Sequence, residues 1–212
     1  GIDPKDIIVI SIMPCVAKKY EIERPENMIG DIKPVDHVLT TREFAQLLKK
    51  NKIDLKNVKA VNPDPFLGVP TGAGVIYGAS GGVMESALRT AYKMITGKKL
   101  PQLELEQVRG IEGFKKTEID INGTKLKVGV INGAANAKII LDELKENPRA
   151  YDYVEMMACF GGCIGGGGQP VPVNDEIRKK RAQGLYNVDT RNNIRMADES
   201  VFVKNLYKQF LA

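Results

Sequence analysis

The chain has 212 residues, a formal net charge of +5 at pH 7, and 43% hydrophobic and 27% charged residues, which suits a globular protein with a buried core in one or two domains. Scattered lysines, few aromatic residues and no tryptophan argue against a nucleic-acid-binding surface. No apolar run is long enough for a membrane span and no signal-peptide layout opens the chain, so we expect a cytoplasmic protein.

The first predicted element is a strand over residues 7–13, a continuous run of mostly β-branched residues. Such runs are typical of a parallel sheet that is covered on both faces. Pro14 ends the strand and puts Cys15 at the carboxyl edge of the sheet, where open α/β folds bind ligands. A second short strand over 38–40 leads into a helix over 42–50, because Thr40 and Glu43 form a capping box.

A proline-rich loop is predicted over residues 62–71, followed by a tight glycine-rich loop over 72–82 and a helix over 83–96. The glycines match a dinucleotide-binding fingerprint only loosely. We therefore favour a helix N-terminus that faces a negatively charged group. The buried stripe of the helix is expected at Val83, Ala87, Ala91 and Ile95.

A hairpin is predicted around Asn122-Gly123, the strongest turn signal in the sequence. A helix over 135–146 and a strand over 151–157 follow, and this strand delivers Cys159 as the first strand delivers Cys15. The shared Met-x-Cys ending suggests pseudo-symmetric halves that present ligands to one cleft.

Two helices are predicted after the glycine-rich segment, over residues 175–183 and 200–211, and Asp198 is expected to open the second. The residues expected to pack the last helix against the sheet are Phe202, Leu206, Phe210 and Leu211. These elements predict one α/β domain, or part of one, with mixed, partly parallel sheets flanked by helices.

The segment 156–170 is the most unusual part of the chain. It holds Cys159 and Cys163, and six of the ten residues from Gly161 to Pro170 are glycine. Glycine costs conformational entropy, so this bare backbone must serve a positive φ or the close approach of a bulky group. Beside two thiols, a group of metal and sulfur fits that need. The alternative is a glycine-rich turn with two inert, buried cysteines.

The third cysteine is Cys15, and an odd number without a secretion signal favours metal or catalytic use over disulfides. Thiolates select soft metals and iron–sulfur clusters, and a four-iron cluster normally takes four cysteines. Either one ligand is therefore missing or it is supplied from outside this chain. The lone histidine, His37, cannot complete a zinc site and is expected at the surface or half buried.

Residues 13–21 (MPCVAKKYE) and 157–170 (MACFGGCIGGGGQP) resemble the second and third signature motifs of the iron-only (FeFe) hydrogenases. Residues 71–90 resemble the glycine segment of the same family. The resemblance covers nearly the whole chain. It implies an iron-only-hydrogenase fold truncated at its N-terminal side, so that residues 1–212 are the C-terminal portion of the H-cluster catalytic domain.

The cofactor that the resemblance implies is the H-cluster, a [4Fe-4S] cubane bridged by one cysteine sulfur to a two-iron unit with CO, cyanide and a dithiolate. By motif position, Cys15 and Cys159 would bind the cubane. Cys163 would bind it and bridge to the two-iron unit.

Four further residues have implied roles near the two-iron unit. Lys18 would hydrogen-bond a cyanide, and Met13 and Met157 would flank the irons. Tyr77 stands where the family often has phenylalanine. From the residues alone, a solvent-facing lysine and core-filling methionines remain the alternatives.

The first motif of the family, Thr-Ser-Cys-Cys-Pro, does not occur in this sequence. That motif supplies the fourth cubane ligand and a cysteine that relays protons. We therefore expect these 212 residues alone to be apo and inactive. The expected partners are the N-terminal remainder of the same protein and an electron carrier, ferredoxin or a nicotinamide-linked subunit.

Reversible reduction of protons to H2 by the parent protein is the leading functional hypothesis. A non-catalytic relative, such as a redox or hydrogen sensor or an iron–sulfur assembly factor, is the main alternative. Lys18 and Met157 favour catalysis, since a carrier of a plain cubane need not bind cyanide, whereas Tyr77 weighs slightly against it. A phosphate-binding glycine loop is a third option, but it lacks the Gly-Lys-Ser/Thr step of a P-loop.

Overall fold

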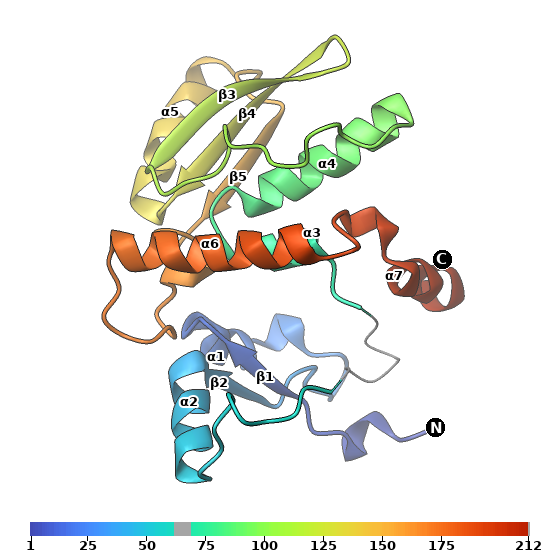
Figure 1. Ribbon diagram of the computed structural model, residues 1–212, viewed down its shortest axis with the longest axis vertical. Coiled ribbons are helices and arrows are strands. Elements are labelled where there is room, and N and C mark those ends of the chain that lie inside the picture. The colour runs from blue at the N-terminus through green and yellow to red at the C-terminus, as the bar shows by residue number, and fades with distance from the viewer. Residues whose placement is uncertain (62–68, 212) are drawn as a thin grey trace. The chain divides into compact units, whose positions relative to one another are not determined.

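The computed structural model describes residues 1–61 and 69–211, in two compact units (Figure 1). Unit 1 comprises Gly1–Val61 and Gly165–Val173, and unit 2 comprises Asn62–Ile164 and Asn174–Ala212. Most of the loop predicted over 62–71 lies outside the described residues. No helix in the described part of the chain combines the length and the apolar character that a membrane span needs.

Unit 1 contains a two-stranded parallel sheet, in which β1 (Ile10–Met13) pairs with β2 (His37–Thr40). The predicted strand before Pro14 and its parallel pairing are confirmed. The prediction that both of its faces are covered is wrong, because Ile10 and Ile12 are 57% and 47% exposed. A sheet of two short strands offers too little apolar area to hold a layer on each face.

Helix α2 (Thr41–Lys50) begins at the capping box that the sequence predicts. Glu43 N donates to Thr40 Oγ1 over 3.2 Å, and Thr40 N donates to Glu43 Oε2 over 2.8 Å. Lys19 of the short helix α1 (Ala17–Glu21) pairs with Glu43 Oε1 at 2.7 Å. Hydrogen bonds from Lys19 and then from Thr40 lower the pKa of Glu43 to about 2.

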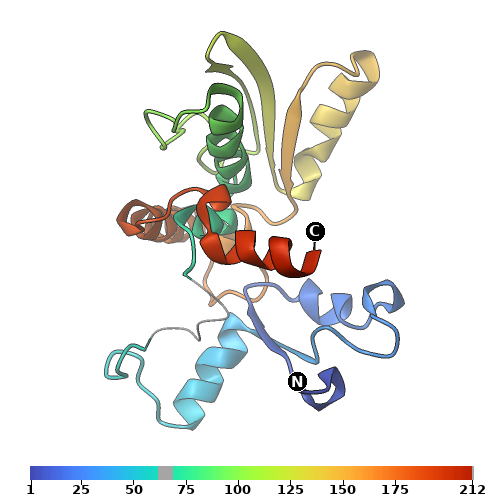
Figure 2. The same cartoon turned by 90° about the vertical axis from the view of Figure 1, so that its right-hand side faces the viewer.

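Unit 2 is built on a mixed sheet of strand order β3-β4-β5. Strand β3 (Phe114–Ile121) runs antiparallel to β4 (Thr124–Asn132), which is parallel to β5 (Tyr153–Met157). Asn122 and Gly123, with φ of 52° and 88°, form the predicted hairpin turn. Helix α4 (Gly82–Thr96) covers one face of the sheet and α5 (Ala137–Glu146) the other (Figures 1 and 2). The predicted mixed α/β class is confirmed.

The buried side of α4 differs from the predicted stripe by one residue. Met84 and Leu88 pack on the sheet, whereas Ile95 is 52% exposed. Hydrophobic periodicity misplaced this face because Glu85 and Arg89, next along the helix, are also buried and owe their burial to ion pairs. The core on this face of the sheet contains Met84, Leu88, Leu105, Val108, Ile119, Ile121, Val128 and Val130.

The glycine-rich segment 72–82 is not the tight loop that the sequence predicts. It forms helix α3 (Gly72–Val75) and a 3-10 turn (Ile76–Gly78), with Thr71 Oγ1 accepting from Gly74 N at the helix start. Gly72 is required by packing, because a Cβ there would lie 2.2 Å from Asp189 Oδ1. The glycines thus allow helices α3 and α6 to approach closely.

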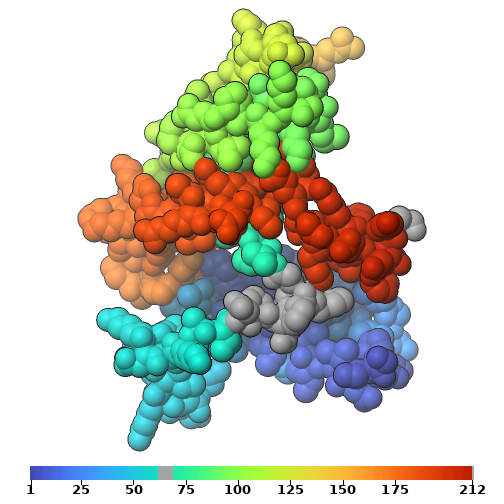
Figure 3. All heavy atoms as spheres, turned by 45° about the vertical axis from the view of Figure 1, so that its right-hand side comes forward, coloured from blue at the N-terminus to red at the C-terminus, as the bar shows by residue number. Residues whose placement is uncertain are grey.

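The C-terminal helices deviate from prediction in length and packing. Helix α6 (Asp175–Arg191) starts at the N-cap Asn174 but passes through Gly184, which lies in open space and does not end it. Atoms of α6 lie at the surface of the face shown in Figure 3. Ser200, rather than Asp198, caps α7 (Val201–Leu206), and a π-helical turn (Tyr207–Leu211) follows.

The packing predicted for the end of the last helix is wrong. Phe210 and Leu211 are 70% and 62% exposed, although Phe202 and Leu206 are half-buried. The change from α-helix to a π-helical turn after Leu206 alters the spacing of the side chains, so that the predicted stripe does not continue.

Candidate metal centre

Residues 159–163, here called the cysteine turn, follow strand β5 of unit 2. Backbone pairing continues beyond the strand, since Gly133 N donates to Met157 O over 2.8 Å and Ala134 N donates to Ala158 O over 3.0 Å. Cys159 therefore stands at the carboxyl edge of the sheet, as the sequence predicts. The two thiols on this turn differ in burial: Cys159 is half-buried and Cys163 is exposed.

The turn requires glycine at positions 161 and 162 for two structural reasons. Gly161 and Gly162 have φ of 89° and 85°, a region that disfavours residues with a Cβ. A Cβ on Gly162 would also lie 2.8 Å from Ser80 N and 2.9 Å from Gly78 O. The absence of a side chain at Gly162 therefore makes room for the backbone of residues 78–80.

Asn132, at the end of β4, holds the turn through its side chain. Its fully buried side chain accepts a short hydrogen bond from Gly161 N and donates to Ile111 O over 2.7 Å. Ser80 N donates to Gly161 O over 3.1 Å, and Gly162 N donates to Cys159 O over 2.9 Å. Sequence reasoning missed Asn132, because Asn132-Gly133 looks like an ordinary turn signal.

Cys15 lies in unit 1, half-buried, two residues after β1. The second half of the glycine-rich segment packs on it: Gly168 N donates to Pro14 O over 3.0 Å, and a Cβ on Gly168 would lie 2.8 Å from Cys15 N. Arg42 fixes the same segment, because its backbone N donates to Gly168 O over 3.2 Å and its Nη2 donates to Gly167 O over 2.8 Å. Gly168 thus allows this segment to pack closely against the backbone at Pro14 and Cys15.

The other predicted site residues are placed as follows. Lys18 pairs with Glu21 on its own helix at 2.6 Å and its side chain is 41% exposed. Met13 and Met157 are half-buried. Tyr77 is 43% exposed, and its hydroxyl lies 3.5 Å from Ser86 Oγ, which donates to it. The cyanide and iron contacts implied for these residues stay predictions.

Glu155 is a second residue that sequence reasoning missed. Its buried carboxylate accepts from Gly81 N at 2.6 Å and from Met84 N at 2.7 Å, at the start of α4. Burial raises its pKa, although these backbone hydrogen bonds oppose the shift. The prediction that this helix N-terminus faces an anionic group is confirmed, and the group is a side chain of the chain itself. The available signal was an acid between apolar residues of a strand.

The three cysteines are the kind of ligand that an iron–sulfur cluster binds, but they are one fewer than a cubane takes. Thiolates are the ligands that such clusters take, and a cubane needs four of them. Among the residues that the structure describes, no three cysteine, histidine, aspartate or glutamate side chains are grouped as a metal site. Cys159 and Cys163 are brought together on one turn, so the chain fits part of a cubane site.

Comparison with known proteins identifies the family. The family model "Iron only hydrogenase large subunit, C-terminal domain" matches residues 1–167, and the model "Iron hydrogenase small subunit" matches residues 175–212. The NADP-reducing hydrogenase subunit HndD of Solidesulfovibrio fructosivorans is 43% identical over 212 residues, which is 100% of this chain and 36% of that protein. Iron hydrogenase 1 of Clostridium pasteurianum is 40% identical over 215 residues, 99% of this chain and 38% of that protein.

Similarity extends to proteins with another role and to solved structures. The cytosolic Fe-S cluster assembly factor narfl of Danio rerio is 27% identical over 217 residues, 100% of this chain and 53% of that protein. The structure of the [FeFe]-hydrogenase HydA(deltaEFG), which reveals stepwise assembly of the H-cluster, matches with a TM-score of 0.79 and 36% identity. The match covers 100% of this chain and 60% of that chain. The chain thus spans 36% and 38% of the length of the two hydrogenases above and 60% of the chain in the solved structure. It belongs to the family of the iron-only hydrogenase large subunit, C-terminal domain, as its two cysteine motifs predict.

Proposed function

We propose that the chain is the C-terminal portion of the catalytic domain of a longer iron-only hydrogenase, which reversibly reduces protons to H2. The observation that carries this proposal is the family match over residues 1–167, which contains all three cysteines in order. The cysteine turn supports it, because Asn132 and Ser80 hold the backbone between Cys159 and Cys163 in one conformation. A turn fixed before metal binding avoids the entropy cost of ordering its ligands.

The proposed ligands of the cubane of the H-cluster are Cys15, Cys159 and Cys163, with Cys163 also bridging to the two-iron unit. When bound, the H-cluster would relay electrons from the carrier and would provide the iron chemistry by which protons and H2 interconvert. The chain contributes thiolates and a shaped surrounding. In unit 2, Gly162 allows the backbone of residues 78–80 to pack against the cysteine turn. In unit 1, Gly168 packs closely against the backbone at Cys15.

Lys18, Met13, Met157 and Tyr77 are the proposed surroundings of the two-iron unit. Lys18 would exchange its ion pair with Glu21 for a hydrogen bond to a cyanide, which a cation on a flexible stem can do at little cost because the pair is exposed. Met13 and Met157 would provide soft, adaptable contacts. Tyr77 would contribute a hydroxyl group to these surroundings.

The fourth cubane ligand is proposed to come from the upstream part of the same protein, together with a proton-relaying cysteine. These 212 residues alone would then be apo and inactive. The electron carrier would be a ferredoxin or a nicotinamide-linked subunit. A cytoplasmic location is part of the proposal. A periplasmic location is the alternative, because the periplasmic [Fe] hydrogenase large subunit of Nitratidesulfovibrio vulgaris is 45% identical over 169 residues.

A non-catalytic iron–sulfur protein is the second candidate. It is favoured by the similarity to assembly factors, which reaches 32% identity over 210 residues in Protein NAR1 of Arabidopsis thaliana. Higher identity to HndD, 43%, favours the hydrogenase.

Hydrogen evolution from reduced viologen separates these two functions. The full-length parent, produced with the maturation machinery that installs the two-iron unit, should evolve H2, and its Cys163→Ser variant should not. An H-cluster spectrum without hydrogen evolution would support a sensor. A cubane without the two-iron unit in the maturated parent would support the assembly role.

A further inference from the structure

Helix α6, which belongs to the part matched by the small-subunit family, contacts the cysteine turn of unit 2 through two arginines. The stem of Arg178 lies against the turn, since a Cβ on Gly161 would be 2.8 Å from Arg178 Cδ. The guanidinium carbon of Arg178 is 5.1 Å from the ring centre of Phe160, and its Nη1 pairs with Asp175 at 2.7 Å. Arg178 therefore covers the turn between the two cysteines.

Arg181 holds the other end of the turn. Its Nη1 donates to Ile164 O over 2.8 Å, and Ile164 directly follows Cys163. One turn of helix α6 thus contacts the backbone on both sides of Gly162, and the two arginines lie three residues apart, on neighbouring positions of one helix face.

The position of α6 is itself fixed by a buried contact. Asp189, near the end of the helix, is fully buried and pairs with Arg89 of α4 at 2.8 Å. A displacement of α6 would break this pair and would also move both arginines. The geometry of the cysteine turn is therefore coupled to the docking of the segment 174–212.

We propose that Arg178 and Arg181 are positioning residues, through which the small-subunit-like segment holds Cys159 and Cys163 in the geometry for metal binding. The physical basis is the freedom of a turn with two adjacent glycines, which needs contacts from outside to adopt one conformation. Ligands oriented by surrounding contacts bind metal more tightly than unsupported ones. By linkage, metal bound at the turn stabilises the docked α6 by the same free energy. The metal-binding part of this inference rests on the proposed function, and the positioning part does not.

The positioning is tested on the metal-free chain by amide hydrogen exchange at Gly161 and Gly162. Arg181→Gln removes the hydrogen bond from Arg181 to Ile164 O, directly after the turn, and should make this exchange about tenfold faster, which corresponds to a loss of about 1.4 kcal/mol. Arg178→Gln should give a smaller acceleration, and Arg181→Lys should restore part of the protection. Lys180→Gln is the matched control, because Lys180 lies on the same helix, is 75% exposed and pairs with Glu176. Unchanged exchange in both arginine variants, with α6 still folded, overturns the proposal.

The effect on the metal is tested by electron paramagnetic resonance of the reduced cubane in the loaded parent. Arg181→Gln and Arg178→Gln should broaden or split the cluster signal, while Lys180→Gln should leave it unchanged. An unaltered signal in variants whose turn exchanges faster would overturn the link between the turn and the metal. If the wild-type parent holds no cluster at all, the proposed function fails, whereas the exchange result still decides whether α6 positions the turn.

Discussion

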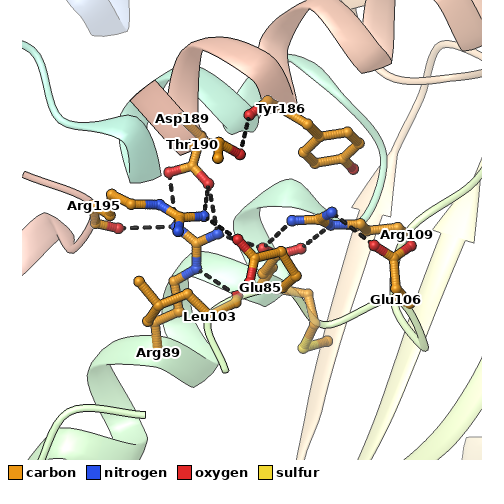
Figure 4. Close-up of polar contacts among 12 residues, drawn as sticks. Glu85, Arg89, Leu103, Glu106, Arg109, Tyr186, Asp189, Thr190 and Arg195 are labelled. Carbon is orange, nitrogen blue, oxygen red and sulfur yellow. Dashed lines mark hydrogen bonds and ion pairs between the residues drawn. The ribbon is translucent and has the colours of Figure 1, made fainter. Parts of the chain in front are cut away.

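Arg89 of helix α4 and Asp189 of helix α6 form a two-point ion pair in which both side chains are fully buried. Arg89 Nη1 donates to Asp189 Oδ1 over 3.0 Å and Arg89 Nη2 donates to Asp189 Oδ2 over 2.8 Å (Figure 4). Glu85 joins Arg89 to Arg109, and Arg195 joins Asp189 to Glu104. Alternating charges along this chain of contacts compensate each other, which is the condition for burying them.

Asp189→Asn should destabilise unit 2 by about 3–5 kcal/mol, because it removes the buried negative charge shared by Arg89 and Arg195 and leaves each arginine with a single acidic partner, Glu85 or Glu104. Urea unfolding measures the loss. The slope of the unfolding free energy against urea concentration should be the same in the wild-type protein and the variant. Asp142→Asn is the control: Asp142 is exposed and pairs with Lys138, so its loss should cost less than about 1 kcal/mol. Equal effects of the two substitutions would contradict the importance of the buried pair.

Gly162→Ala should unfold or distort the cysteine turn, and Gly123→Ala provides the comparison. Both glycines have φ near +90°, but a Cβ on Gly123 meets nothing within 4 Å, whereas one on Gly162 meets backbone atoms at 2.8 Å. Gly123→Ala should therefore cost about 1–2 kcal/mol from backbone strain alone. Gly162→Ala should cost about 1–3 kcal/mol more because of overpacking. A smaller loss at Gly162 than at Gly123 would show that residues 78–80 do not press on the turn.

Glu155→Gln should destabilise the start of α4 by about 1–3 kcal/mol, because Gly81 N and Met84 N donate to different carboxylate oxygens and the amide nitrogen that replaces one of them cannot accept. Its pH dependence gives a second readout. Burial raises the pKa of Glu155, so the wild-type protein gains stability from protonation of this group as pH falls from above its folded pKa toward its unfolded pKa. The variant should lack that increment, which unfolding curves at several pH values will show. A parallel pH dependence in both proteins would refute the assignment.

Glu43 should titrate far below a normal glutamate. Lys19 and Thr40 lower its pKa to about 2, so the carboxylate stabilises the start of α2 fully above its unfolded pKa and loses this contribution as pH falls toward about 2. Carbon-detected NMR of the Glu43 carboxyl measures the value directly. Lys19→Met should move it upward while the Thr40 bond remains, and a midpoint near 4.5 in the wild-type protein would contradict the pairing.

Local signals in the sequence were sufficient for the capping box at Thr40, the hairpin at Asn122-Gly123 and the position of Cys159 after a strand. Each depends on neighbouring residues, so periodicity and turn chemistry determine it. The two cysteine motifs were also sufficient for the family. The buried face of α4 was not predictable in this way, because burial of Glu85 and Arg89 depends on partners such as Asp189, a hundred residues further along the chain.

The candidate site shows the same limit. The sequence located the cysteines and the glycines, but not why Gly162 and Gly168 must be bare, since the backbone that approaches each is distant in sequence. Asn132 and Glu155 escaped notice because their function is to bond backbone groups of other elements. Such residues become visible only when the elements are placed in space.

Iron and sulfide analysis, with electron paramagnetic resonance of the full-length parent and its single-cysteine variants, tests the central claim most directly. Cys15→Ser, Cys159→Ser and Cys163→Ser should each lose or alter the cubane signal and lower the iron content, whereas His37→Ala, which changes an exposed non-ligand, should retain both. Wild-type iron content and an unchanged cubane signal in any one of the three cysteine variants would contradict the account.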